Sequence, residues 1–351
     1  MTINNWKPLR IIAPVVMAAQ FTAMVPAAFA EDKSLNIYNW SGYISPELVD
    51  KFEAETGIDV RLDTYDSNET LLAKLSAGSS GYDIAITSEN FLPIMVEQGL
   101  VQKIDVSKMP NYANLAQEWK EQEWDPGNKY SVVWNWGTTS VMVDTGIYKG
   151  PIDSLSVVFN PPSELQGEVG MSGSVSELVS LAWVYLDRPQ CSEDPEDLQA
   201  LLELLNNQKP HVKVYDAAAV AERLASGELI AAQAWSGAAY QARQGRSSLE
   251  YLYPKEGVYG WADNMVIPAS AGNIESATVF INFMMDPENM AMLSNYTGSP
   301  NGIPGSDAFI KDELKTAPEY AVPSDVRIHF GKQCSVEALR AYDQIWTRVR
   351  G

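Results

Sequence analysis

The residues of this sequence best suited to bind a ligand are tryptophans that stand next to acidic side chains. Trp261 and Asp263 lie two positions apart, just before the apolar segment 265–267. In an extended chain their side chains point the same way. The indole face offers a cation–π contact of about 0.5–2 kcal/mol, and the carboxylate offers a charge-assisted hydrogen bond of about 1.5–3 kcal/mol. The pair suits an ammonium group, although an acidic residue near a tryptophan is also common on protein surfaces.

Several other aromatic residues fall where predicted strands end or turns begin. The chain has 10 tryptophans and 16 tyrosines, and those in such positions are Trp40, Tyr43, Trp136, Trp235 and Trp261. Any single ring is as well explained by a place in the core or at its rim. As a set, their repeated placement after strands favours a binding site. Glu177 is a second acidic candidate, but an acid in the first turn of a helix is usually explained by the helix macrodipole.

Motifs that would indicate catalysis are missing from the sequence. It contains no GxSxG, HExxH, P-loop or GxGxxG pattern, and Cys334 with His329 has no orienting partner at a recognisable spacing. Two cysteines and two histidines cannot assemble a zinc cluster of the usual kind. We therefore expect no catalytic residues, no metal and no cofactor. An exported hydrolase with paired carboxylates remains a minor alternative, because nothing singles out one pair among 45 acidic residues.

The first 30 residues have the pattern of an export signal. Lys7 and Arg10 precede a largely apolar run over 11–25, and Ala28 and Ala30 are the small residues that a signal peptidase requires. We expect cleavage after Ala30; retention of the segment as an anchor is the less favoured alternative. The formal net charge of −20 argues against nucleic acid or an anionic membrane as a partner, since both need a basic surface. Cys191 and Cys334 stand in a chain destined for an oxidising compartment, yet their spacing leaves open whether they form a disulfide.

The first part of the chain beyond the signal predicts an α/β fold. A strand over 35–38 is followed by a helix with Ser45 as N-cap, Pro46 in its first turn and Gly57 at its end. A second strand covers 60–64, Asn68 is the expected cap of the next helix, and a third strand covers 83–87. These strands should be parallel, which brings the loops 40–43 and 88–90 together at one edge of the sheet.

A second α/β unit follows a long apolar stretch. Residues 130–143 are too β-branched for a helix and long for one strand, and we expect them to cross between two lobes. Ser176 is the expected cap of a helix that carries Glu177. Further on, the patterns predict helices over 195–205 and 218–225, strands over 212–215 and 229–235, and helices over 274–285 and 288–296.

Several short motifs follow one another over nearly the whole chain: 37–44 (IYNWSGYI), 52–58 (FEAETGI), 65–70 (YDSNET), 81–84 (GYDI), 235–237 (WSG), 253–257 (YPKEG) and 261–263 (WAD). In sequence and in order they resemble the periplasmic polyamine-binding proteins of bacterial ABC importers, the spermidine- and putrescine-binding group. The resemblance implies a type II periplasmic-binding-protein fold, in which two α/β lobes are joined by crossing hinge strands and a ligand cleft lies between them. It places lobe 1 at 31–141 plus 262–309, and lobe 2 at 142–261 plus 310–351.

The same resemblance implies a set of ligand-binding residues. An aromatic box of Trp40, Tyr43, Trp235 and Trp261 would enclose the methylene chain of a polyamine. Asp263 and Glu177 would hold its ammonium groups, and the wall would be completed by Ser41, Ser88, Trp136 and Gln333. It also implies a periplasmic location, a small cationic amine as ligand, an inner-membrane ABC permease as partner and a monomeric protein.

Departures from the family pattern reduce the number of acids. Gly42 stands where relatives usually carry an acid, Gly173 and Ser174 replace aspartates before Glu177, and Ala238 replaces an aspartate of putrescine-preferring relatives. Asn90 and Ser299 occupy positions where some relatives have aromatic residues. A buried ammonium is costly without a partner, so we favour a putrescine-like diamine over spermidine. An agmatine-like compound or an ω-amino acid is an alternative, and a sensor subunit for a membrane signalling protein is an alternative role.

Overall fold

The computed structural model describes residues 1–2, 33–216 and 219–350. The expected export signal therefore lies, apart from residues 1–2, outside the described residues. Contacts divide the chain into Met1–Asp32 and Lys33–Gly351, and only the second unit is considered below. In the described part of the chain, no helix combines the length and the apolar character needed to cross a membrane.

The first group of elements begins with the expected parallel strands. β1 (Ser34–Trp40) lies between β2 (Asp59–Tyr65) and β3 (Ile84–Ser88) and pairs with both in parallel. The connecting helix α1 (Pro46–Thr56) starts after Ser45, whose Oγ accepts from Leu48 N at 3.1 Å, and ends at Gly57 with φ of +67°. These caps confirm the helix read from the sequence.

The second helix of this group starts one residue earlier than expected. Ser67 caps α2 (Asn68–Ser76), and its Oγ accepts from Thr70 N at 3.1 Å. Asn68 is thus the first residue of the helix, and its side chain is directed to β3 instead. The prediction of Asn68 as the cap was wrong because two adjacent residues, Ser67 and Asn68, are both good caps and only tertiary contacts select between them.

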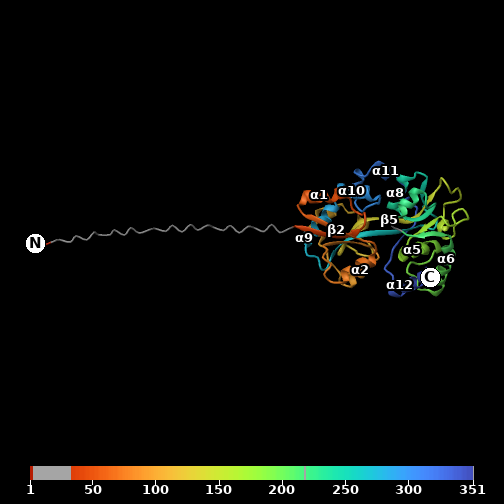
Figure 1. Cartoon of the computed structure of the whole chain (residues 1–351), viewed down its shortest axis with the longest axis horizontal. Coiled ribbons are helices and arrows are strands. Elements are labelled where there is room, and N and C mark those ends of the chain that lie inside the picture. Colours follow the sequence, from red (N-terminus) through yellow and green to blue (C-terminus); the bar gives the residue numbers. More distant parts are fainter. Residues whose placement is uncertain (3–32, 217–218, 351) are drawn as a thin grey trace. The chain divides into compact units, whose positions relative to one another are not determined.

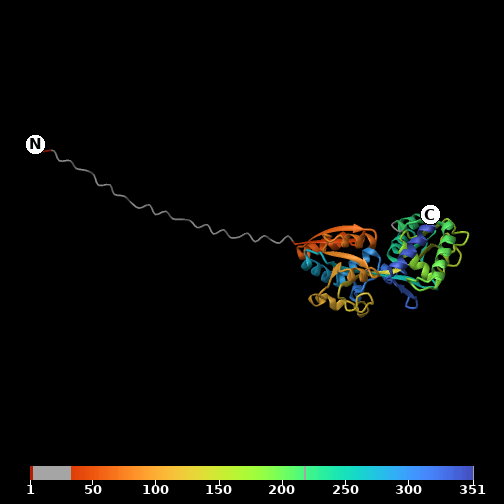
Figure 2. The same cartoon turned by 90° about the horizontal axis from the view of Figure 1, so that it is seen from below.

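Two long strands connect the first group to the second. β5 (Ser131–Asp144) and β10 (Val258–Pro268) pair antiparallel, and the strands follow the order β2-β1-β3-β10-β5-β8-β6-β7. Figure 1 shows yellow β5 and cyan β10 running from one group of elements to the other, and Figure 2 shows the same crossing from a second side. The segment expected to be long for one strand is a single strand of 14 residues, and its role as a crossing element is confirmed.

The second group repeats the α/β pattern. β8 (Ala231–Trp235) pairs with β5, and β6 (Val169–Met171) pairs in parallel with β8 and with β7 (Val212–Tyr215). Helix α5 (Val175–Leu186) starts after Ser174 rather than after Ser176, but Glu177 still lies in its first turn. The hydroxyls of Ser174 and Ser176 instead bond each other at 3.0 Å, so the helix has no side-chain cap.

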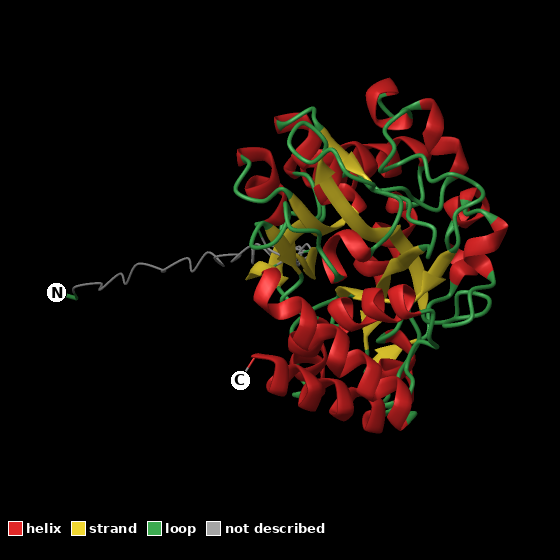
Figure 3. Cartoon of the chain, turned by 90° about the vertical axis from the view of Figure 1, so that its right-hand side faces the viewer, coloured by secondary structure: helices red, strands yellow, loops and turns green. Residues whose placement is uncertain are grey.

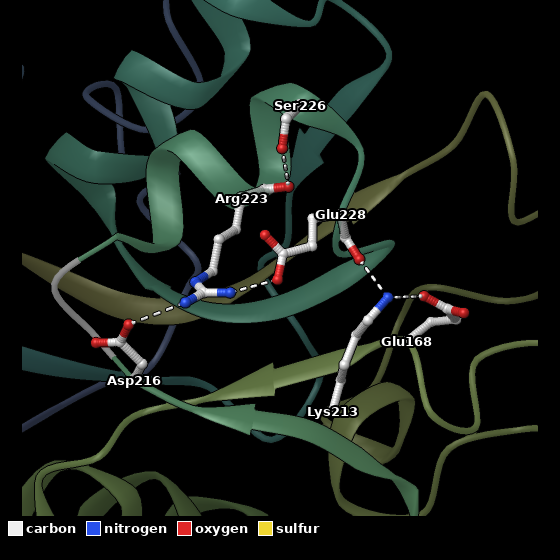
Figure 4. Close-up of polar contacts among 6 residues, drawn as sticks. All are labelled: Glu168, Lys213, Asp216, Arg223, Ser226 and Glu228. Carbon is white, nitrogen blue, oxygen red and sulfur yellow. Dashed lines mark hydrogen bonds and ion pairs between the residues drawn. The ribbon is translucent and has the colours of Figure 1, made fainter.

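A polar network surrounds the end of β7 in this second group. Lys213 bonds the Glu168 carboxylate at 2.9 Å and the Glu228 carbonyl at 2.8 Å, while Arg223 on α7 (Val220–Ser226) pairs with Glu228 and with Asp216 (Figure 4). The pairs are partly exposed, so each contributes little to stability. They connect α7 to the residue that follows β7, and β7 to the residues that follow α7.

Helices cover both sides of the sheet in each group (Figure 3). In the first group, α1, α9 (Ile274–Met284) and α10 (Pro287–Thr297) pack on one face, and α2 and α3 (Leu92–Glu97) pack on the other. In the second group, α4 (Ser156–Phe159), α5, α6 (Pro195–Gln208) and α12 (Val336–Arg350) share one core, and α7 and α8 (Ser236–Gly245) share another. The shorter elements are β4 (Val101–Gln102), β9 (Leu249–Tyr251), α11 (Asp312–Lys315) and β11 (Ile328–Phe330).

Cys191 and Cys334, whose pairing the sequence left open, form a disulfide. The bond joins the loop after α5 to the segment that leads into α12, across 143 residues of sequence. It thereby fixes the C-terminal helix to the second group of elements.

Candidate ligand-binding site

The strand register places the candidate residues on one face of the sheet. Asp263 lies opposite Ser88 on one side and Asn135 on the other, Trp261 lies opposite Gly137, and Trp235 lies opposite Thr139. Directly paired residues share a face, and so do residues two positions apart on one strand. The row therefore continues along β5 and β10 from the first group of elements to the second. The alternation that Trp261 and Asp263 suggested in the sequence is confirmed.

Asp263 forms the acidic end of this row in the first group. It is 6% exposed, and its carboxylate accepts from the Tyr43 hydroxyl at 2.8 Å and from the Ser88 hydroxyl at 2.9 Å. Burial raises its pKa to about 6, and the hydrogen bonds from Tyr43 and Ser88 oppose the rise. The carboxylate is thus held in place by neutral donors, and no cation in the described chain neutralises it.

The hydroxyl of Tyr43 also contacts Asn135 Oδ1, at 2.6 Å. A hydroxyl has one proton, so it cannot donate both to Asp263 and to an amide oxygen. Both contacts are satisfied when Asn135 presents its Nδ2, which is otherwise buried without a partner, to the hydroxyl oxygen. Asn135 then orients Tyr43 toward Asp263.

Asn68 supports the Asp263 carboxylate indirectly, through Ser88. Its Nδ2 donates to Ser88 Oγ at 3.0 Å, and its Oδ1 accepts from Ser88 N at 3.3 Å. This arrangement aims the Ser88 hydroxyl at Asp263. The sequence analysis missed the roles of both asparagines. Asn68 stands at a helix start and was therefore interpreted as a cap, and Asn135 stands inside an apolar strand, where no local signal marks it.

Glu177 forms the second acidic end, in the other group of elements. Its carboxylate accepts from Trp235 Nε1 at 2.9 Å and from Ser172 Oγ at 3.4 Å, and its own backbone oxygen accepts from Gln233 at 3.2 Å. Burial raises its pKa to about 7, and the charge of Asp263 adds to the rise. Although the side chain keeps some exposed surface, dense protein surrounds it, and a cavity of 10 Å³, about the size of one water molecule, adjoins it.

Tryptophan rings lie between and beside the two acids. Trp261 covers Gly137, where a Cβ would collide with the indole ring, so only glycine permits this contact. Trp40 ends β1 and packs against Tyr65 with ring centroids 4.4 Å apart. The Nε1 groups of Trp40 and Trp261 are buried without a hydrogen-bond partner among the described residues. The arrangement offers apolar indole faces for an aliphatic chain and carboxylates for its ammonium groups.

Three expected residues are not brought to this row. Trp136 points to the opposite face of β5, where its ring lies 5.7 Å from that of Trp119 and its Nε1 donates to the Asn301 carbonyl at 3.2 Å. There it lines a separate cavity of about 600 Å³ that includes neither Asp263 nor Glu177. Gln333 is exposed beside the disulfide, and Ser41 is exposed in the turn after β1. Trp136 and Trp261 also lie inside strands, so the expectation that they stand at strand ends or turns was wrong for these two residues.

The chain belongs to the family of bacterial extracellular solute-binding proteins, which it matches over residues 47–322. It is similar to a "Putrescine/agmatine-binding protein" of Pseudomonas aeruginosa strain PAO1, with 34% identity over 92% of this chain and 94% of that protein. It is also similar to the "Putrescine-binding periplasmic protein SpuD" of P. aeruginosa strain UCBPP-PA14, with 32% identity over 97% and 98%. A solved structure described as a "Putative spermidine/putrescine ABC transporter from Listeria monocytogenes" has 30% identity, a TM-score of 0.85, and coverage of 91% of this chain and 99% of that one. The fold is therefore the two-lobe α/β fold of periplasmic binding proteins.

Proposed function

We propose that the protein is the periplasmic solute-binding component of an ABC importer and that it binds a putrescine-like diamine between its two lobes. The observation that carries the proposal is the single row of side chains with a carboxylate at each end. At one end Asp263 accepts hydrogen bonds from Tyr43 and Ser88, and at the other Glu177 accepts one from Trp235. Two acids match the two ammonium groups of a diamine, and the indole faces match its methylene chain. The names of the P. aeruginosa relatives support the same ligand class.

The strand crossing suggests how binding leads to transport. We place lobe 1 at 31–141 plus 262–309 and lobe 2 at 142–261 plus 310–351, so that Asp263 belongs to the first and Glu177 to the second. A diamine that bonds both acids stabilises the conformation in which the lobes approach each other. We propose that an inner-membrane permease recognises this form, that the protein acts as a monomer, and that it carries out no reaction on its ligand.

An agmatine-like ligand is the second candidate. A guanidinium is planar and can bond a carboxylate through two parallel N–H groups. Glu177 receives only one bond shorter than 3 Å, from Trp235, so the carboxylate retains capacity to accept from such a group. The name of one relative, which includes agmatine, supports this alternative.

The function is tested by calorimetry and thermal shift with a series of amines. Putrescine, cadaverine, agmatine, spermidine and an ω-amino acid are compared at pH 7.5, with the uncharged diol of the same length as putrescine as a control. We expect putrescine or agmatine to bind most tightly and the diol not to bind. A ligand that binds only the folded protein raises its melting temperature, because it stabilises the folded state by RT ln(1 + [L]/Kd). Absence of binding by every amine would refute the proposal, and tighter binding of spermidine would refute the preference for a diamine.

A further inference from the structure

Glu89 is a buried acid that the proposed amine contacts do not use. It follows β3 directly and is 1% exposed. Its backbone N donates to the Ala262 carbonyl at 2.9 Å, and its Oε2 accepts from the Ala262 N–H at 2.9 Å. The main chain and the side chain of one residue thus hold both polar groups of Ala262, the residue just before Asp263.

Glu89 lies where β10 changes its partner. β10 pairs with β3 from Asp263 to Val266 and with β11 from Val258 to Gly260. Ala262 falls in the interval between these two ladders, and Glu89 supplies the hydrogen bonds that neither β3 nor β11 provides there. On the lobe boundaries proposed above, this interval is the passage from one lobe to the other.

Two residues from the other side of this passage, Tyr259 and Gly331, approach the Glu89 carboxyl group. A Cβ at Gly331, just after β11, would collide with both Glu89 Oε1 and the Tyr259 hydroxyl, so these two oxygens lie close together against the Gly331 backbone. Glu89 Oε1 is buried without a hydrogen bond from the described residues; the nearby Gly331 N–H donates to the Gly260 carbonyl at 3.3 Å and only adds a weak field that favours the ionised form. An ionised carboxylate with one such oxygen out of reach of water is costly, whereas a neutral carboxyl group is tolerated.

The groups around Glu89 favour its neutral form. Asp263 and Tyr259, both on β10, are the titratable groups that interact with it, and neither is a cation. From β11 and the residues after it, the group that influences the pKa of Glu89 is the backbone N–H of Gly331. Burial raises the pKa of Glu89 to about 8, the charge of Asp263 adds to the rise, and the N–H groups of Ala262 and Gly331 oppose it. Burial raises the pKa of Tyr259 well above its ordinary value, and the charges of Glu89, Glu177 and Asp263 add to the rise.

We propose that Glu89, as a neutral carboxylic acid, is a positioning residue that holds Ala262 at the crossing and thereby aligns Asp263 for the amine, and that ionisation of Glu89 loosens the crossing and weakens amine binding. This inference rests on the proposed function. An ionised Glu89 gains hydration only when its carboxylate leaves Tyr259 and Gly331, and that movement separates the ends of β3 and β11. The amine then meets an acid pair that is no longer aligned across the two lobes.

Glu89→Gln tests the inference, because the amide resembles the neutral carboxyl group and does not ionise. Glu97→Gln, an exposed acid on α3, is the matched control. With putrescine as the probe, we expect Glu89→Gln to bind within about threefold of wild type at pH 7. Between pH 7 and pH 9 the affinity of wild type and of Glu97→Gln should fall about tenfold relative to Glu89→Gln, as expected for a group with a pKa about one unit below the final pH. Identical pH profiles for wild type and Glu89→Gln would overturn the inference.

A measurement without ligand separates this inference from the proposed function. The infrared C=O band of a protonated carboxylic acid should be present in ligand-free wild type at pH 7 and weaker in Glu89→Gln by one group. Failure of putrescine to bind at any pH, with this band present, would refute the proposed function and leave the protonation of Glu89 established. Absence of a band difference at pH 7 would refute the neutral state of Glu89 whatever binds in the cleft.

Discussion

Asp263→Asn should have opposite effects on amine binding and on the stability of the ligand-free protein. For binding, the change removes the negative charge that would neutralise one buried ammonium. Breaking a buried ion pair by removing one partner costs about 3–5 kcal/mol. At about 1.4 kcal/mol for each factor of ten, the dissociation constant for putrescine should rise by about 10²- to 10⁴-fold.

For folding, the same change removes an unfavourable charge. The pKa of Asp263 is raised from 3.8 to about 6, which corresponds to about 3 kcal/mol at about 1.36 kcal/mol per unit. The unfolded chain gives up this proton first as the pH rises, so wild-type stability falls between about pH 4 and pH 6 and this loss persists above that range. The variant avoids the loss. Ser88 can still donate to the Asn oxygen, and Tyr43 can accept from its amide.

Calorimetry with putrescine at pH 7.5 and urea unfolding of the ligand-free protein at pH 4 and pH 7.5 measure the two effects. Asp50→Asn, an exposed acid on α1, is the control for the loss of one charge. We expect Asp263→Asn to be more stable than wild type at pH 7.5 and to lose most of that advantage at pH 4. A variant that binds putrescine as tightly as wild type would refute the placement of an ammonium at Asp263. Destabilisation at pH 7.5 would refute the reasoning about its buried charge.

Three further predictions follow from the same contacts. Putrescine affinity should rise from pH 5 to pH 7.5. The raised pKa values of Asp263, about 6, and Glu177, about 7, leave these acids partly protonated at the lower pH. Calorimetry in two buffers should therefore detect protons released on binding. Trp235→Phe removes the N–H bond to Glu177 and should weaken putrescine about tenfold, since a hydrogen bond to a charged group contributes about 1.5–3 kcal/mol; unchanged affinity would mean that Trp235 does not orient Glu177. Cys191→Ser with Cys334→Ser should lose about 2–5 kcal/mol of stability in urea unfolding and keep its affinity for putrescine, because the disulfide lies outside the row of binding residues.

Local signals in the sequence were sufficient for most helices and strands. Ser45, Pro46 and Gly57 mark the two ends of α1, and each acts through contacts within a few residues. The boundaries of α2 and α5 were missed by one or two positions where several serines or asparagines stand together. At α2 the choice of cap depends on contacts distant in sequence, those of Asn68 with Ser88. At α5 the hydroxyls of Ser174 and Ser176 bond each other, so neither acts as a side-chain cap.

The site was predicted less completely because its composition depends on strand register. Trp134 and Trp136 lie on one face of β5 and Asn135 on the other, and a shift of one residue would exchange them. The pairing of Trp261 with Gly137 determines which set meets Asp263. Nothing within 130–143 reports that pairing, so the tryptophan was chosen and the asparagine was not. Glu89 was missed for a similar reason, since its partners Ala262 and Gly331 are distant in sequence.

The number of acids in the row also limits which amines it can hold. Asp263 and Glu177 supply two charges, while Gly42 and Ala238 stand where the family pattern has further acids. Gly42 has φ of +68°, a conformation that favours glycine, so the missing acid there is linked to the turn that directs Tyr43 to Asp263. A third ammonium near Trp261 would gain about 2 kcal/mol from the ring when desolvated. That gain is smaller than the several kcal/mol required to bury an unpaired charge, so we expect a triamine to leave one ammonium in water and a diamine to place both on carboxylates.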